Sequence, residues 1–124
     1  MVSPYNETAR DTTPAYDLAD VHALASKESI CINGDARKTL RQFAALGLPS
    51  PGEEPLLCKL LLQLQQSHFV CSVQYDNKPT WLDVYVLPKW RAPNGDDYSM
   101  FVKFKFSPSG TLLTICSCHP EGWS

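Results

Sequence analysis

Residues 80–106 read TWLDVYVLPKWRAPNGDDYSMFVKFKF, and this stretch decides the fold that we expect. On each side of a polar loop the side chains alternate with a period of two, which is typical of β-strands. The same alternation continues on both sides of the stretch and predicts a four-stranded meander. The predicted strands cover residues 68–75, 81–87, 98–106 and 111–118.

The third predicted strand carries two lysines, Lys103 and Lys105, which share one face with Phe101. Side chains two residues apart on a strand lie about 7 Å apart, near the spacing of consecutive phosphates in a nucleic acid. The pair therefore predicts a cationic strip on one face of the sheet. The alternative is an ordinary solvated strand face.

The N-terminal half of the chain has a helical period instead. The segment YDLADVHALASK places Leu18, Val21 and Leu24 on one face. The next segment, GDARKTLRQFAALGLP, is expected to end at Gly47, which suits the left-handed position after a helix, and Pro49 cannot continue the helix. The leucines of SPGEEPLLCKLLLQLQQS repeat at helical spacing and predict a third, buried helix.

These patterns indicate an α+β fold in which three N-terminal helices pack on one face of a four-stranded, mainly antiparallel sheet. Residues 1–13 are polar and aperiodic, so we expect them to form a flexible tail. Residues 14–124 are expected to form a single domain. Asp83 is expected to cap or bond to loop backbone.

Composition limits the classes of function. The chain has 124 residues, of which 44% are hydrophobic and 19% charged, as in one soluble globular domain. No apolar run reaches the roughly 20 residues that span a bilayer, and no signal-peptide pattern is visible. Because no secretion signal is visible, the five cysteines predict reduced thiols in a cytoplasmic protein. The net charge of −2 counts against a broad nucleic-acid-binding surface but allows a local basic patch. Since no glycine-rich phosphate loop or dinucleotide fingerprint occurs, no cofactor is expected.

Six short motifs follow one another along residues 14–119. They are Pro14-x-Tyr16-x-Leu18, Leu46-Gly47-Leu48, His68-Phe69-Val70-Cys71-Ser72, Trp81-Leu82-Asp83-Val84-Tyr85, Met100-Phe101-Val102-Lys103, and Cys116 to His119. In this order they resemble the motifs of the MqsR family, RelE-like ribonuclease toxins of bacterial toxin–antitoxin pairs. The resemblance implies a RelE-like fold and a cognate antitoxin protein as partner. It also implies cleavage of single-stranded mRNA, without a metal, by attack of the RNA's own 2′-hydroxyl.

The polar positions of the family's active site are largely replaced in this chain. The resemblance places them at Cys71, Leu82, Phe101 and Cys118. A slip of one residue in the last strand would move the fourth position from Cys118 to His119. A leucine cannot donate a hydrogen bond, and a phenylalanine lacks the hydroxyl of tyrosine. Two functions stay open. One is an MqsR-like endoribonuclease toxin with a relocated site, and the other is a catalytically degenerate binding module that contacts RNA or a protein partner without cutting.

A relocated site has candidates on the predicted sheet. Lysines would hold phosphate oxygens, and histidine is the side-chain type that titrates near neutral pH without help. The catalytic candidates are Lys103, Lys105, His119 and Tyr75.

Basic and aromatic residues in the connections between strands predict RNA contacts. The loop PKWRAPNGDD combines cations with an indole ring, which suits base stacking and phosphate binding. A tryptophan there could equally fold inward. The candidates for RNA binding are Lys78, Lys89, Trp90 and Arg91.

The thiols give a further alternative if the family fold holds, because Cys71 and Cys118 would then meet in the cleft. A set formed by His68, Cys71, Cys116 or Cys118, and His119 would approach zinc-ligand geometry, or the two thiols would form a disulfide. Reduced cysteines that pack in the core are the default, so no metal is expected.

Overall fold

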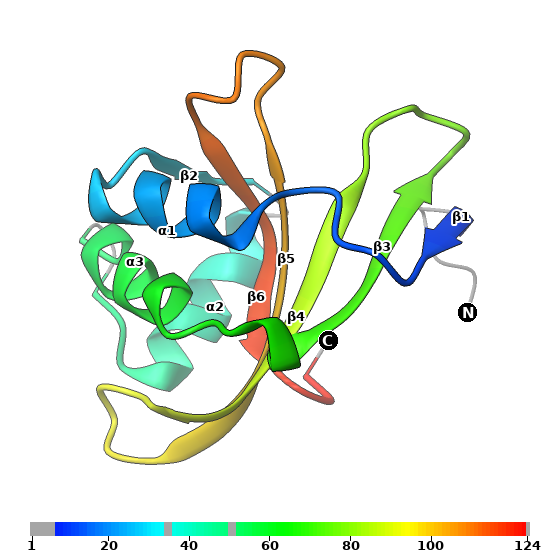
Figure 1. Ribbon diagram of the computed structural model, residues 1–124. Helices are drawn as coiled ribbons and strands as arrows, with labels where there is room; N and C mark the ends of the chain where they lie inside the picture. The colour runs from blue at the N-terminus through cyan, green and yellow to red at the C-terminus, as the bar shows by residue number, and fades with distance from the viewer. Residues whose placement is uncertain (1–6, 34–35, 50–51, 124) are drawn as a thin grey trace.

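The computed structural model describes residues 7–33, 36–49 and 52–123, with the side chains of residues 36–40 left aside. Figure 1 shows the helices gathered at the left of the strands that cross the middle of the molecule. The elements, in chain order, are β1 (Glu7–Asp11), α1 (Leu18–Ser26), β2 (Ile30–Ile32), α2 (Ala36–Leu46), α3 (Glu54–Leu62), the 3-10 helix η1 (Gln66–His68), β3 (Phe69–Tyr75), β4 (Leu82–Arg91), β5 (Asp97–Phe106) and β6 (Leu113–Pro120).

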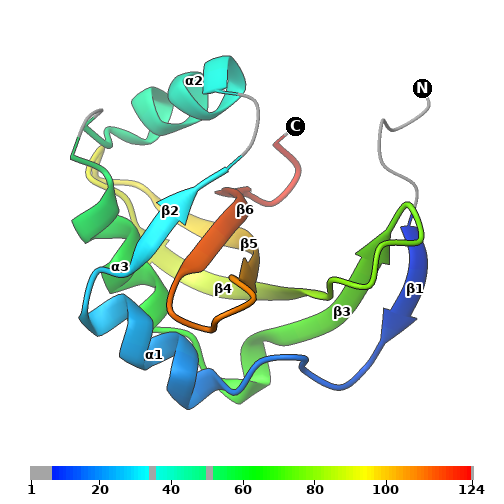
Figure 2. The ribbon, with the colours of Figure 1, turned by 90° about the horizontal axis from the view of Figure 1, so that it is seen from above.

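The sheet is mixed and has six strands in the order β1-β3-β4-β5-β6-β2. Neighbouring strands are antiparallel except for β2, which runs parallel to β6. The expected arrangement of three helices on a four-stranded sheet is therefore wrong, because a further strand is added at each edge of the meander. Figure 2 shows the two added strands, β1 and β2, far apart on opposite sides of the sheet.

Both added strands lack the signal that a sequence pattern can detect. β1 is exposed at four of its five positions, so no apolar alternation marks it. β2 has only three residues, too few to show a period. Residues 7–11 of the expected flexible tail (residues 1–13) instead pair with β3, and residues 1–6 lie outside the described residues.

The main core lies between the helices and the central strands. Its largest fully buried side chains include Tyr85, Phe104 and Met100 from β4 and β5, which pack with leucines of α3. The apolar side of α1 joins them through Leu18 and Val21. This arrangement leaves the other face of β3, β4, β5 and β6 to a second group of side chains.

We call that other face the outer face, and define it by Tyr75, Val84, Phe101, Lys103 and His119. Strand alternation separates these residues from the core residues on the same strands. A small apolar cluster on this face contains residues of β3, β4 and β5 alone, namely Cys71, Val73 and Val84, with Tyr75, Leu82 and Phe101 packed against it.

The helices of the described residues include none that is both long and apolar enough to cross a membrane.

Candidate functional site

Two of the four predicted catalytic residues touch on the outer face. Lys103 Nζ donates a hydrogen bond to the Tyr75 hydroxyl at 3.1 Å and lies 4.6 Å from the centroid of its ring. Tyr75 ends β3, whereas Lys103 lies in the middle of β5, so the lysine side chain reaches across β4. The position that Lys103 faces on β4 is Val84, a small side chain that leaves room for this crossing.

His119 lies beside this pair on the next strand. It faces Phe101 across β5 and β6, and the two rings stack with centroids 5.2 Å apart. His119 Nδ1 lies 2.8 Å from the carbonyl oxygen of Pro120. Because a carbonyl can only accept, Nδ1 carries the hydrogen, and Nε2 is the acceptor in the tautomer that this contact selects. Since Phe101 is two residues from Lys103, the imidazole flanks the Lys103–Tyr75 pair.

Lys105 extends the cationic strip along β5. It faces Thr114, whose hydroxyl lies 3.2 Å from the Cys31 thiol of β2. Burial raises the pKa of the neighbouring Cys116 thiol, while Lys105 and Lys103 act in the opposite direction. Both lysines therefore direct positive potential onto the same part of β6.

Three of the positions to which the MqsR resemblance assigns polar groups, Cys71, Leu82 and Phe101, come together in the apolar cluster of the outer face. Arg10 of β1 donates to the Cys71 thiol at 3.4 Å and also pairs with Glu7, with 2.7 Å between the charged atoms. The apolar cluster thus has Arg10 on one side and Lys103 on the other. Sequence reasoning missed Arg10, because nothing in the polar segment around it predicted a strand.

Cys118 does not join this group, so the expected meeting of Cys71 with Cys118 is wrong. Cys118 packs in the main core at 7% exposure, and burial raises its pKa to about 12. β4 and β5 lie between the strands that carry the two thiols. All five cysteines are free: Cys31, Cys58, Cys71, Cys116 and Cys118.

A zinc site is not assembled either. His68 is part of η1, where its Nδ1 accepts the backbone N–H of Gln65 at 3.0 Å. Within the described part of the chain, no three His, Cys, Asp or Glu side chains group closely enough to hold a metal ion.

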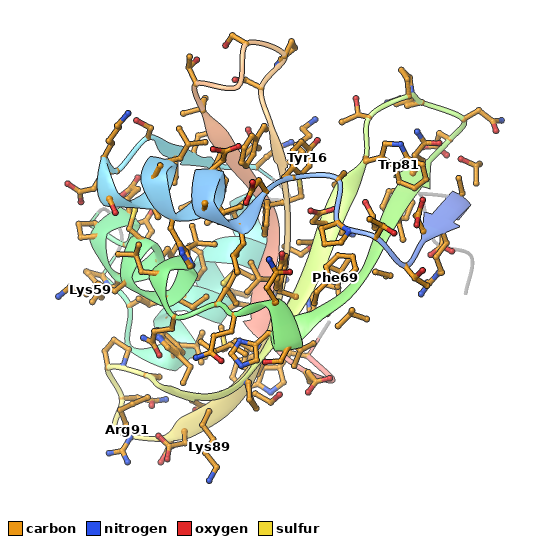
Figure 3. The ribbon with its side chains drawn as sticks, in the orientation of Figure 1. Tyr16, Lys59, Phe69, Trp81, Lys89 and Arg91 are labelled. Carbon is orange, nitrogen blue, oxygen red and sulfur yellow. The ribbon has the colours of Figure 1, made fainter. Side chains whose placement is uncertain are left out.

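The predicted RNA-binding residues are dispersed. Lys89, Trp90 and Arg91 belong to β4 rather than to a loop, and Trp90 is buried at 5% exposure, so it cannot offer a face to a base. Arg91 is held by Asp97, with Nε 2.6 Å from a carboxylate oxygen. Figure 3 shows Lys89 and Arg91 at the tip of the β4–β5 hairpin. Lys78 is exposed in the turn before β4, at the strand's opposite end.

Asp83 fixes the segment that joins β1 to α1. It is fully buried and accepts hydrogen bonds from the backbone N–H groups of Ala15 and Tyr16, both at 3.0 Å. The Ser72 hydroxyl donates to it at 2.8 Å. This confirms the expectation that Asp83 bonds to loop backbone, and it places Asp83 on the face away from Lys103.

A scan against protein-family models and a search of curated proteins found no match to this chain. The functional argument therefore rests on the geometry. The outer face brings together a lysine, a phenol, an imidazole acceptor and an apolar cluster, with further cations on both sides. Such a set can neutralise a phosphate, accept a proton and donate one.

Proposed function

We propose that the protein acts on single-stranded RNA that lies across the outer face, and that it cleaves this RNA as the resemblance to MqsR-like toxins implies. The observation that carries the proposal is the contact between Lys103 and Tyr75 beside the His119–Phe101 stack. The fourth group that we predicted to be catalytic, Lys105, lies two residues from Lys103 on β5, so all four share one face of the sheet.

Each group has a role in a reaction that needs no metal. His119 Nε2 accepts the proton of the 2′-hydroxyl, whose oxygen then attacks the adjacent phosphorus. Lys103 stabilises the negative charge of the phosphorane. The bond from phosphorus to the 5′-oxygen breaks, and Tyr75 donates its proton to that oxygen. The products are a 2′,3′-cyclic phosphate and a free 5′-hydroxyl.

Binding would use the rest of the outer face. Lys103 and Lys105 stand at a spacing of about 7 Å, which suits neighbouring phosphates. Phe101 and His119 offer ring surface to an unpaired base, and aromatic stacking tolerates any base sequence. Arg10 adds a cation at the β1 side of the face.

Incubation of end-labelled single-stranded RNA with the protein in excess chelator tests the proposal. We expect discrete products that end in a cyclic phosphate. Lys103→Ala should slow cleavage by about 100-fold or more, the typical effect of removing one donor that stabilises transition-state charge. Lys59→Ala is the matched control, since this exposed lysine lies on α3 and not on the outer face, and cleavage should stay unchanged.

Full activity in Lys103→Ala would refute the assignment of the site. A second readout is growth, since induced expression in bacteria should slow growth and produce new 5′ ends in cellular transcripts. A cognate antitoxin is the expected partner and should restore growth when expressed together with the protein.

The second candidate is a binding module that does not cut. It is favoured by the apolar cluster, because Cys71, Leu82 and Phe101 stand where the family has polar groups. In that case RNA should bind without products. Lys103→Ala should then lower the log–log salt dependence of binding by about one unit for each lost phosphate contact.

A further inference from the structure

The peptide group that joins Leu64 to Gln65 is held by two histidine rings. It follows the end of α3, and His22 of α1 places its Nε2 at 3.0 Å from the Leu64 carbonyl oxygen. His68 of η1 accepts the Gln65 N–H at its Nδ1, also at 3.0 Å. The Gln65 side chain in turn accepts the backbone N–H of His68. These contacts fix the position of both rings relative to the backbone.

The same contacts decide which nitrogen of each ring carries the hydrogen. Because a carbonyl can only accept, the hydrogen of His22 is on Nε2, and Nδ1 is the acceptor in the tautomer that this contact selects. His68 has the opposite arrangement, since its Nδ1 accepts a hydrogen bond and its hydrogen is therefore on Nε2. Within the described part of the chain, neither His22 Nδ1 nor His68 Nε2 has a hydrogen-bond partner. One ring thus offers an acceptor and the other a donor.

Both histidines line the same cavity, which has a volume of about 590 Å³. Both are half-buried, so a ligand in the cavity can reach part of each residue. Apolar walls come from Leu62 at the end of α3 and from Leu87 and Pro88 of β4. The volume lies within the range of roughly 300–1,000 Å³ that is usual for sites of small molecules, and such sites combine apolar walls with a few polar groups.

The polar groups of the cavity favour an uncharged ligand. None of the described residues that line it is an aspartate or glutamate, so an ammonium or guanidinium group would find no counterion. Lys89 is the cation of the wall, but it is exposed, and Figure 3 shows its side chain extended away from the helices. An anion would therefore not be held either. The imidazoles of His22 and His68 and the carboxamide of Gln63 instead suit a neutral ligand that has both donors and acceptors.

We propose that this cavity binds a nucleobase, with adenine as the best match. The amino group of adenine can donate to His22 Nδ1, and its ring nitrogens can accept the His68 Nε2–H. A glutamine carboxamide such as that of Gln63 pairs with adenine through a donor and an acceptor at once. The flat base would pack against the apolar walls. None of the described wall residues belongs to the outer face, so the proposal is independent of the RNA reaction.

The base could come from a free nucleoside or from an RNA strand. Adenosine represents the first source. The trinucleotide ApApA with 2′-O-methyl groups represents the second, since it lacks the hydroxyl that cleavage requires. N6,N6-dimethyladenosine keeps the base but has no amino hydrogens to donate. Calorimetric titration of the full chain, with each probe at up to millimolar concentration, measures the affinities. Correlation spectra of the histidine ring nitrogens show where each probe binds, and His119 on the outer face serves as the internal reference.

We expect adenosine to bind and to shift the ring-nitrogen signals of His22 and His68, while those of His119 stay unchanged. N6,N6-dimethyladenosine should bind about fivefold more weakly, as fits the loss of one hydrogen bond. His68→Asn keeps an acceptor for the Gln65 N–H but removes the Nε2–H, and it should weaken adenosine binding by about fivefold. Lys59→Ala, on α3 but outside the cavity, is the matched control and should leave the affinity unchanged.

Tighter binding of the trinucleotide, with shifts at His22 and His68, would assign the site to a base of an RNA strand. Equal or weaker binding would assign it to a free nucleoside. The proposal is overturned if neither adenosine nor the trinucleotide binds, or if binding leaves the His22 and His68 signals unchanged. It is also overturned if His68→Asn binds adenosine as well as the wild type does. If that variant does not fold, equal affinity of the wild type for adenosine and its dimethyl derivative would overturn the proposal instead.

Discussion

At the scale of a residue, the buried carboxylate of Asp83 holds the segment between β1 and α1 in place. The carboxylate is fully buried and receives three hydrogen bonds, two from backbone N–H groups and one from Ser72. Hydrogen bonds to a charged acceptor are about twice as strong as neutral ones, and they offset the cost of burying the charge. Through Asp83 the segment before α1 is held against β4.

We predict that Asp83→Asn destabilises the protein by about 2–3 kcal/mol, because an amide presents only one acceptor and turns its own N–H donors toward backbone donors. Ser72→Ala is the milder comparison and should cost about 1 kcal/mol. Urea denaturation followed by fluorescence measures both. A loss below about 1 kcal/mol for Asp83→Asn would show that the two backbone bonds contribute little.

At the scale of elements, local signals identified the helices and the four meander strands, but not the two edge strands or the full length of β4. The end of α2 at Gly47 is confirmed, since Gly47 has φ of 84° and the N–H of Leu48 donates to the Phe43 carbonyl at 2.9 Å. The hydrophobic period of the four meander strands also placed Lys103 and Tyr75 on one face. These features depend on neighbours in sequence, which a pattern can show.

Irregular strand pairing explains why the sequence pattern did not place the side chains of Trp90 and Cys118 in the core. The register of β4 against β5 shifts between Leu87 and Trp90, so both side chains are buried although they stand three positions apart. A second shift, opposite Lys103 and Phe104, places Cys118 on the same side as Ile115. A bulge depends on the partner strand, so the sequence of one strand does not reveal it.

We predict that Gly47→Ala is far more damaging than Gly110→Ala. A Cβ at Gly47 would lie 2.8 Å from the backbone nitrogen of Asn94, whose N–H donates to the Leu46 carbonyl at 3.0 Å. The left-handed conformation costs about 1–2 kcal/mol in each variant. The contact in the β4–β5 loop should raise the total for Gly47→Ala to about 3 kcal/mol, as for an overpacked site.

Gly110 provides the control because its φ is 73° and a Cβ added there would meet no described atom within 4 Å. Thermal and chemical unfolding of the two variants, measured side by side, separate the free-energy cost of the left-handed backbone conformation from that of the contact with Asn94. Equal destabilisation would mean that the β4–β5 loop moves freely to make room, and that it does not hold the end of α2.

At the scale of the whole molecule, the two faces of the sheet divide the titratable groups. The cations of the outer face are accessible, while several weak acids are enclosed by the core. Burial raises the pKa of Cys58, and it raises those of Cys118 and Tyr85 to about 12. These three groups stay protonated in the folded chain at pH values where the unfolded chain loses its protons.

The last prediction is that stability declines at alkaline pH through these buried acids. A group with a raised folded-state pKa contributes stability that is complete below its unfolded pKa, about 8.5 for a thiol, and is lost as pH rises toward the folded value. Unfolding free energy should therefore fall between about pH 8.5 and 12, by up to about 1.4 kcal/mol per pH unit for each titrating group. Cys118→Ala should be less stable at neutral pH, because it leaves a small void, yet its alkaline decline should be shallower by about that amount. Urea denaturation under reducing conditions, repeated across this pH range, measures the decline of the unfolding free energy for the wild type and for Cys118→Ala. Parallel curves for these two proteins would show that Cys118 ionises as readily in the folded chain as in the unfolded one.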